Sequence, residues 1–166
     1  MARFETKLLD AGDAFPDLKV KLIDGREVQA REATKQDWNV ILFYRGAWCP
    51  FCQTQLKSFQ SGLEKLAEEG IGVLAASVDS LEDAQKTQKE TGAEFPIAYG
   101  LPVEETAKTI GAFYDANPAD KALYIQATGF VLNPDGKVMV SVYSSGAIGR
   151  LGWQDVLGLV KHLKAH

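Results

Sequence analysis

The sequence predicts an α/β fold with a mixed, mostly parallel central sheet flanked by helices and a β-hairpin as an N-terminal extension. Apolar runs typical of buried strands alternate along the chain with stretches whose apolar residues recur every three or four positions. Asp24-Gly25 and Asp135-Gly136 stand between strand-like segments, where such pairs form tight turns. The 166 residues contain no internal repeat or linker, so we expect one domain over residues 1–166.

The N-terminal part of the chain predicts a hairpin followed by a central strand. In residues 18–22 apolar side chains alternate with lysines, which indicates a half-buried strand that reaches the turn at Asp24-Gly25. Residues 39–44 form an almost uninterrupted apolar run and therefore predict a strand buried on both faces.

The middle of the chain predicts strands and helices in alternation. Pro50 suits the first position of a helix because its φ is fixed and its missing N–H is not needed there. The apolar spacing after it predicts a helix that ends near Gly70. Residues 71–77 predict a second buried strand, and Ser80 begins a helix that runs to about Thr91.

The C-terminal part predicts a short strand at residues 95–99 and a helix that opens at Pro102. Residues 129–132 and 138–142 predict the two strands of a hairpin. A last helix is expected from about Trp153, with its apolar face directed inward.

Composition excludes several classes of function. Hydrophobic residues make up 46% and charged residues 24% of the chain, and the net charge is −4. A chain this acidic has no general affinity for phosphate backbones or anionic lipid. The first residues contain no apolar segment of a secretory signal, and the apolar run at 40–44 is far shorter than the ~20 residues that span a bilayer. We therefore expect a cytoplasmic protein that binds neither nucleic acid nor membranes.

The two cysteines, Cys49 and Cys52, lie between the predicted central strand and the helix that follows it. Free N–H groups and the positive end of the dipole stabilise a thiolate at a helix N-terminus and lower its pKa. One helical turn separates the two side chains, so a small adjustment brings them within disulfide range. A CxxC pair at this junction predicts dithiol redox chemistry.

Two other interpretations of the pair are weaker. Zinc needs about four ligands, whereas the two histidines, His162 and His166, lie at the C-terminus and no second cysteine pair exists. Inert core cysteines are also common, but the strand–helix junction and Pro50 between the cysteines disfavour that interpretation. We expect neither a metal nor an organic cofactor.

The segment WCPFC at residues 48–52 looks like the redox motif of thioredoxins. The layout of nearly the whole chain, however, resembles the peroxiredoxins of the alkyl hydroperoxide reductase type. The segments that carry this second resemblance are Asp13-Ala14-Phe15-Pro16, Phe43-Tyr44, Phe95-Pro96 and residues 130–136. The resemblance implies a thioredoxin-like fold and thiol-dependent reduction of hydroperoxides.

The motif departs from the pattern that this family shows. In the family's register Arg45 replaces a proline, Cys49 replaces a threonine, and Cys52 takes the place of the cysteine that attacks peroxide. The arginine that the family carries before a later strand would fall near Ala127 and is missing. The cis-proline that thioredoxins carry there is missing too.

Four residues are candidates for supporting the thiolate or the substrate. Arg45 either brings a permanent positive charge to the motif or ends a strand in solvent. Trp48 adjoins the motif, and Thr128 neighbours the position of the missing arginine. Arg150 could supply the missing cation from elsewhere, although an exposed loop arginine is the commoner case.

The predicted function is a thiol peroxidase that cycles Cys49 and Cys52 between dithiol and disulfide. The resemblance implies a hydroperoxide substrate, thioredoxin, glutaredoxin or glutathione as the reductant, and a homodimer as one assembly. The alternative is a general thiol–disulfide oxidoreductase without peroxidase activity. A non-catalytic thioredoxin-fold interaction module is the third interpretation.

Two arguments disagree about which sulfur attacks. Cys49 would occupy the cap of the helix, nearer solvent, and apolar packing would raise the pKa of Cys52. The first cysteine is also the nucleophile in thioredoxins. The peroxiredoxin register instead assigns the attack to Cys52. We expect Cys49 to attack in disulfide exchange and Cys52 in the reaction with peroxide.

Mild oxidation is expected to remove both thiols within one chain, because Cys49 and Cys52 are near enough to pair. Mass spectrometry should find the loss of two hydrogens in the peptide that contains both residues, without covalent dimers, and dithiothreitol should reverse it. A peptide mass that does not change on oxidation would contradict the dithiol interpretation.

Overall fold

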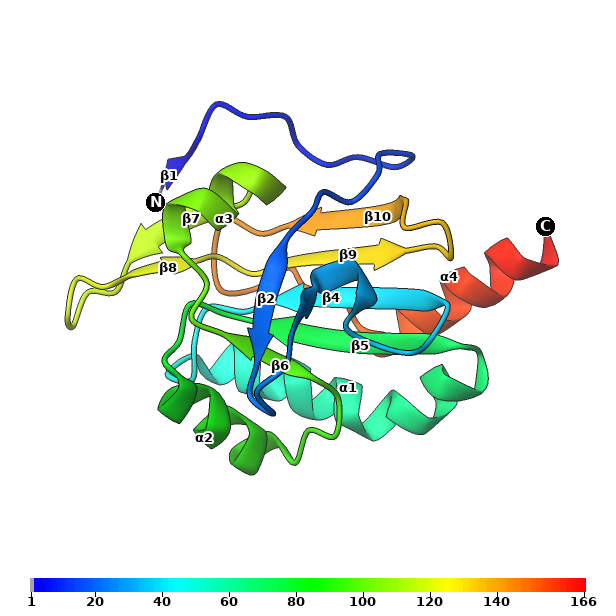
Figure 1. Cartoon of the computed structure of the whole chain (residues 1–166), viewed down its shortest axis with the longest axis horizontal. Coiled ribbons are helices and arrows are strands. Elements are labelled where there is room, and N and C mark those ends of the chain that lie inside the picture. Colours follow the sequence, from blue (N-terminus) through cyan, green and yellow to red (C-terminus); the bar gives the residue numbers. More distant parts are fainter. Residues whose placement is uncertain (1) are drawn as a thin grey trace.

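The computed structural model describes residues 2–166 (Figure 1). The helices are α1 (Pro50–Glu68), α2 (Leu81–Thr91), α3 (Val103–Ile110) and α4 (Trp153–Ala165), with a 3₁₀ turn at Ala30–Glu32. The strands are β1 (Ala2–Arg3), β2 (Lys19–Leu22), β3 (Glu27–Gln29), β4 (Trp38–Phe43), β5 (Ile71–Ala76), β6 (Ile97–Tyr99), β7 (Phe113–Ala116), β8 (Leu123–Ile125), β9 (Thr128–Leu132) and β10 (Val138–Tyr143).

Seven strands form the central sheet in the order β10-β9-β4-β5-β6-β2-β3. The expected hairpins are present, because β2 pairs with β3 across Asp24-Gly25 and β9 pairs with β10 across Asp135-Gly136. The sheet is mixed, as predicted, but "mostly parallel" is wrong: within the described residues only β4·β5 and β5·β6 are parallel pairs. Hairpins occupy both edges of the sheet. Strand β9 pairs with β4, and β2 pairs with β6, and both of these pairs are antiparallel.

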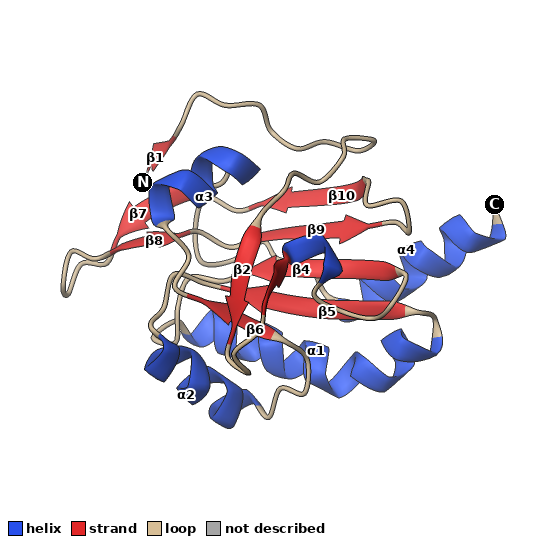
Figure 2. Ribbon diagram, in the orientation of Figure 1, coloured by secondary structure: helices blue, strands red, loops and turns tan. Residues whose placement is uncertain are grey.

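Helices cover the two faces of the sheet unequally. Helices α1, α2 and α4 pack together on one face, against inward side chains such as Val40 and Leu42 of β4. The other face is covered by α3 and the N-terminal segment, which contact Ile41 and Phe43. Figure 2 shows α3 and the N-terminal segment on a different side of the strands from α1 and α4. Because β4 is buried on both faces, it holds the residues that follow it in a fixed position.

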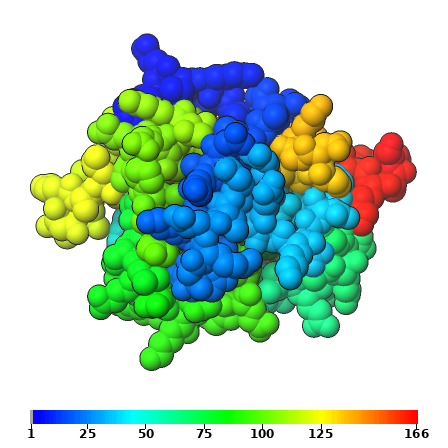
Figure 3. Space-filling view, in the orientation of Figure 1, coloured from blue at the N-terminus to red at the C-terminus, as the bar shows by residue number. Residues whose placement is uncertain are grey.

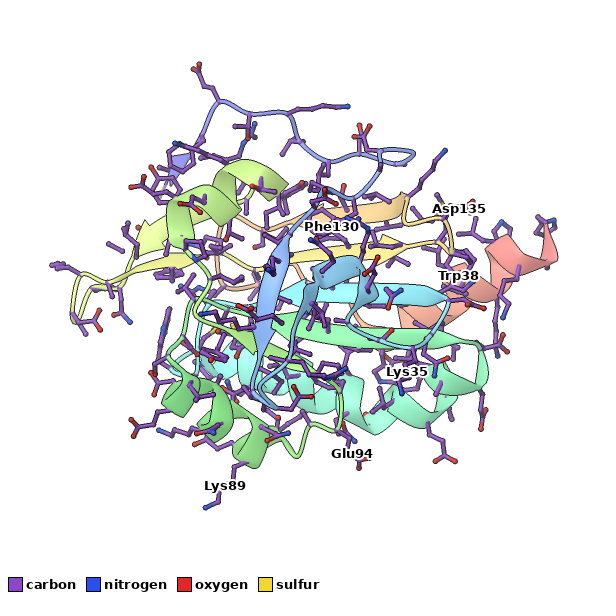
Figure 4. All side chains as sticks on the ribbon, viewed as in Figure 1. Lys35, Trp38, Lys89, Glu94, Phe130 and Asp135 are labelled. Atoms are coloured by element: carbon purple, nitrogen blue, oxygen red, sulfur yellow. The ribbon has the colours of Figure 1, made fainter. Side chains whose placement is uncertain are left out.

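Phe130 on β9 anchors the core beneath the N-terminal segment (Figure 4). The rings of Phe15, Phe43 and Tyr143 lie edge-on to it, with centroid distances of 5.3, 6.1 and 5.7 Å. Edge-to-face packing at these distances is favourable for aromatic rings. The segment around Phe15, one of those that carried the resemblance, is therefore held against the sheet.

The hairpin of β7 and β8 was not predicted. It forms a separate small sheet with β1, in the order β1-β7-β8. Its tip projects from the molecule in the space-filling view (the yellow region of Figure 3). All four residues of β7 are half-buried, so no alternation of apolar and polar residues marks the strand.

Gly62 on α1 allows the close approach of α4. A Cβ at this position would overlap the indole of Trp153, the first residue of α4. We expect Gly62→Ala to lower the free energy of unfolding by about 1–2 kcal/mol, because overpacking outweighs the better helix propensity of alanine.

Gly158→Ala on α4 is the matched control, because its Cβ would meet nothing within 4 Å. It should raise stability by about 0.5–1 kcal/mol. Urea unfolding of the reduced proteins measures both values, and equal stabilities for the two variants would contradict the packing of α4 on α1.

Candidate active site

The thiol pair is built by the junction of β4 and α1. Pro50 is the first residue of α1, and Cys49 is its N-cap in extended conformation. The backbone N–H of Cys52 donates to Cys49 Sγ over 3.3 Å, as expected for a capping side chain. The two sulfurs lie 2.7 Å apart and both cysteines are free, so the Cys52 thiol is placed to donate to a Cys49 thiolate.

Two guanidinium groups converge on the sulfurs. Arg150 Nη2 lies 3.0 Å from Cys52 Sγ and 3.6 Å from Cys49 Sγ. Arg45 Nη1 lies 3.7 Å from Cys49 Sγ, and the Arg45 backbone N–H donates to Cys52 Sγ over 3.3 Å. Arg150 is thus not the exposed loop arginine that its sequence context favoured.

Arg150 is held by its own segment and by α1. Its Nε donates to the carbonyl of Ala147 over 2.7 Å, and its Nη1 donates to Gln55 Oε1 over 2.9 Å. Gln55 also donates from Nε2 to the carbonyl of Leu151 over 3.0 Å. The sequence interpretation missed Gln55, although it lies one helical turn after Cys52, and that spacing could have indicated it.

Arg45 is held between two aromatic rings. Its guanidinium carbon lies 4.8 Å from the ring centroid of Trp48 and 5.1 Å from that of Tyr124. Its Nη2 also donates to the Tyr124 hydroxyl over 3.0 Å. Tyr124 was missed because the β7–β8 hairpin that carries it was not predicted, and because 79 residues separate it from Arg45.

Thr128 lies at the start of β9 and is buried. Its hydroxyl donates to the carbonyl of Gln126 over 3.0 Å. That hydrogen bond satisfies the hydroxyl within its own segment, so the structure connects Thr128 to the local backbone rather than to the sulfurs.

The two thiols have opposite electrostatic environments. The pKa of Cys49 is well below that of an ordinary thiol, mainly because the Cys52 thiol and N–H donate to it, with Arg150 and Arg45 adding positive charge. Burial raises the pKa of Cys52, and its hydrogen bond to Cys49 raises it further. These directions favour a negative charge on Cys49 and a proton on Cys52, although Cys52 Sγ also accepts the Arg45 N–H and lies 3.0 Å from Arg150 Nη2.

Asp79 fixes the loop that leads into the motif. Its Oδ2 accepts the backbone N–H of Ala47 over 2.9 Å. Burial raises the pKa of Asp79 to about 6. Asp79 follows β5, the parallel neighbour of β4, and side chains after parallel strands meet at one edge of a sheet. That rule could have indicated Asp79.

Both cysteines are 0% exposed, so neither sulfur is open to solvent. Arg45 and Arg150 contact these buried sulfurs, so a substrate can reach sulfur only if neighbouring side chains move. Beside the pair lies a groove of about 490 Å³ between α1 and residues 147–151, which we call the α1 groove.

Over residues 2–166, no three or more His, Cys, Asp or Glu side chains are grouped so that they could bind a metal ion. Within the same residues, no helix combines the length and apolar character that crossing a bilayer requires.

The fold and the capped CxxC pair define a thiol-dependent redox enzyme. Residues 11–141 match the family model described as the AhpC/TSA family, and the chain belongs to that family. Similar proteins include alkyl hydroperoxide reductase C of Staphylococcus epidermidis, which is 27% identical over 146 residues (86% of this chain and 74% of that protein). Alkyl hydroperoxide reductase C of Staphylococcus aureus is 28% identical over 132 residues (76% and 68%).

Solved structures support the fold. Peroxidoxin BcpB of Mycobacterium tuberculosis aligns with a TM-score of 0.76 at 18% identity, covering 93% of this chain and 98% of that one. A peroxiredoxin-like protein of Aquifex aeolicus aligns with a TM-score of 0.75 at 21% identity, covering 95% and 89%. The thioredoxin-like fold is thereby confirmed. Family membership supports thiol-dependent peroxidase function and does not favour the general exchange alternative.

Removing the Cys52 donor is expected to raise the pKa of Cys49. The order should be wild type, then Cys52→Ser, then Cys52→Ala, because a serine hydroxyl still donates to the thiolate and alanine does not. Thiolate absorbance followed against pH measures the shift, and the wild-type transition should lie at least one unit below the ~8.5 of a free cysteine.

Arg150→Gln is expected to raise the same pKa by a smaller amount, because a charge is lost while a polar side chain remains. Lys57→Gln, which removes an exposed cation from α1, is the control.

For the Cys52 variants, identical titrations of Cys52→Ser and Cys52→Ala would contradict the thiol–thiolate hydrogen bond.

Proposed function

We propose that the chain reduces hydroperoxides through a Cys49/Cys52 dithiol–disulfide cycle in which Cys49 is the attacking thiolate. The observation that carries this assignment is the set of donors around Cys49 Sγ, which includes the Cys52 N–H and thiol and the guanidinium of Arg45. It favours Cys49 over the Cys52 that the family register indicates, because a nucleophile must be deprotonated and Cys52 holds the shared proton.

The oxidising half of the cycle follows from this arrangement. The Cys49 thiolate attacks the terminal oxygen of the hydroperoxide, the O–O bond breaks, and Cys49 becomes a sulfenic acid. The alkoxide that leaves takes the proton of the Cys52 thiol and departs as an alcohol. The Cys52 thiolate then attacks the Cys49 sulfur and displaces hydroxide, which becomes water with a proton from solvent.

Arg45 and Arg150 serve this sequence as electrostatic groups. A guanidinium group carries a permanent positive charge in proteins. The two arginines stabilise the initial thiolate on Cys49 and, through the 3.0 Å contact of Arg150, the thiolate that forms on Cys52 during the second step. Trp48 and Tyr124 hold Arg45 in position, and Gln55 holds Arg150.

The reducing half of the cycle returns the disulfide to two thiols by exchange with an external dithiol. Thioredoxin, glutaredoxin or glutathione is the reductant that we propose for the chain. One domain over residues 1–166 carries the whole cycle in this proposal, in the cytoplasm, and the chain assembles as a homodimer.

Single substitutions test which sulfur attacks. Cys52→Ser and Cys49→Ser, each treated with one equivalent of hydrogen peroxide and a sulfenic-acid trapping reagent, should label strongly at Cys49 in the first and weakly at Cys52 in the second. We expect the labelling rates to differ by about tenfold or more, because the two thiols differ in ionisation.

Preferential labelling of Cys52 in the Cys49→Ser protein would reverse the assignment and restore the register of the family. Oxidation of the wild-type protein no faster than that of free cysteine at the same pH would exclude the peroxidase function itself.

A further inference from the structure

Large apolar side chains are exposed on the segments that carry the thiol pair and Arg150. In the described residues, the large hydrophobic side chains that remain exposed are Leu8, Trp48, Phe51, Leu81, Leu123 and Ile148. Trp48 and Phe51 belong to the motif itself, and Ile148 lines the α1 groove. These three are 44%, 50% and 69% exposed. Phe51 and Ile148 both line the α1 groove, and exposed apolar groups that share one groove mark a surface that another molecule covers.

The α1 groove is connected to the thiol pair through Arg150, and neither cysteine lines it. Phe51, Phe59, Ile148 and Leu151 contribute apolar walls, and Gln55 and Arg150 form its polar end. Arg150 is both a lining residue of the groove and a direct contact of Cys52 Sγ at 3.0 Å. A group seated in the groove therefore lies beside the reacting pair.

The lining of the α1 groove favours a ligand with an apolar surface over a charged ligand. Arg150 is the only charged residue among its described lining residues, and its N–H groups already bind Gln55, the carbonyl of Ala147 and the sulfurs. Glutathione carries two carboxylates and one ammonium group, for which this lining offers no free partner. A small ligand would also leave the protruding Phe51 and Ile148 side chains in water, whereas the surface of a folded protein can cover them.

We propose that the α1 groove receives an apolar side chain next to the cysteine of a protein dithiol, which is the reductant of the oxidised enzyme. The proposal rests on the function proposed above and selects a protein reductant over glutathione. The specificity-determining residues are Phe51 and Ile148, which stand at the mouth of the groove.

The exchange balances within the two dithiols. A thiolate of the partner attacks Cys49 Sγ, the Cys49–Cys52 bond breaks, and Cys52 leaves as a thiolate beside Arg150. The second thiolate of the partner then attacks its own sulfur in the mixed disulfide and releases Cys49. The enzyme gains two electrons, the partner is oxidised to a disulfide, and the protons of the partner's two thiols pass to solvent or to the enzyme pair.

Two synthetic dithiol peptides that differ only in the residue before the first cysteine, leucine in one and serine in the other, test the proposal. The protein is first oxidised with diamide, so that the measurement does not depend on peroxide activity. The leucine peptide should reduce the wild-type disulfide about tenfold faster than the serine peptide, because one apolar side chain is buried in the groove.

Ile148→Asp should bring that ratio close to one, because it places a charge at the mouth of the groove. Leu81→Asp on α2 is the matched control, since it also replaces an exposed leucine-sized side chain, and its ratio should stay near the wild-type value. A wild-type ratio near one, or equal ratios in the two variants, would overturn the proposal.

A second measurement tests whether the α1 groove binds a protein partner or the apolar part of a hydroperoxide. The oxidation rates with cumene hydroperoxide and with hydrogen peroxide give a second ratio, which should be the same in the wild type and in Ile148→Asp. If Ile148→Asp changes the hydroperoxide ratio and leaves the peptide ratio intact, the groove binds the substrate and the proposal is wrong. Slow oxidation by every hydroperoxide, with the peptide ratio intact, would remove only the peroxidase function.

Discussion

The chemistry of the site depends on the hydrogen bonds that one helix terminus leaves free. The first turn of any helix has N–H groups without partners inside the helix. At the start of α1 the N–H of Cys52 donates to Cys49 Sγ, and the sulfur stands where an oxygen usually caps a helix. Helix α1 cannot rotate to relax this contact, because the face that carries Cys52 is buried along its length, against β5 and, at Gly62, against Trp153.

Positive charge from two distant parts of the chain completes the site. A buried thiolate costs free energy unless donors and charges compensate for lost water. Arg45 and Arg150 provide this compensation, and neither is joined to a carboxylate by an ion pair among those recorded for the described residues. Oxidation to a disulfide removes the anion that both arginines contact. The arrangement therefore stabilises the reduced form relative to the oxidised one, which makes a dithiol pair more oxidising.

The residues around the thiols come from two kinds of segment, the regular elements β4 and α1 and the irregular segment between β10 and α4. Cys49, Cys52 and Gln55 are fixed by β4 and α1, which belong to the core. Arg150 comes from the irregular segment between β10 and α4, where Gly149 has a positive φ of 81° that favours glycine. Because both sulfurs are covered, access to them requires movement, and this segment has fewer backbone hydrogen bonds to break than the strand or the helix.

Short stretches of the sequence predict the local features of the fold, namely individual strands, helices and turns. The apolar run before the motif predicted β4, Pro50 and the apolar spacing predicted α1, and Asp-Gly pairs predicted both hairpins of the central sheet. These features depend on the conformational preferences of neighbouring residues. They were sufficient to locate the cysteine pair at a helix terminus and to indicate a lowered pKa for Cys49.

The features of the fold and the site that depend on long-range contacts could be seen only in the tertiary structure. The antiparallel pairings of β9 with β4 and of β2 with β6 join segments whose order in the sheet no local pattern encodes. The position of Arg150, which follows Cys52 by 98 residues, depends on how the segment after β10 returns across α1. Tyr124 reaches Arg45 only because β8 pairs with β7. The sequence by itself located the cysteine pair and its helix cap. The charges and rings around the pair, and with them the choice between the two sulfurs, depend on the fold, because they come from segments that meet only in three dimensions.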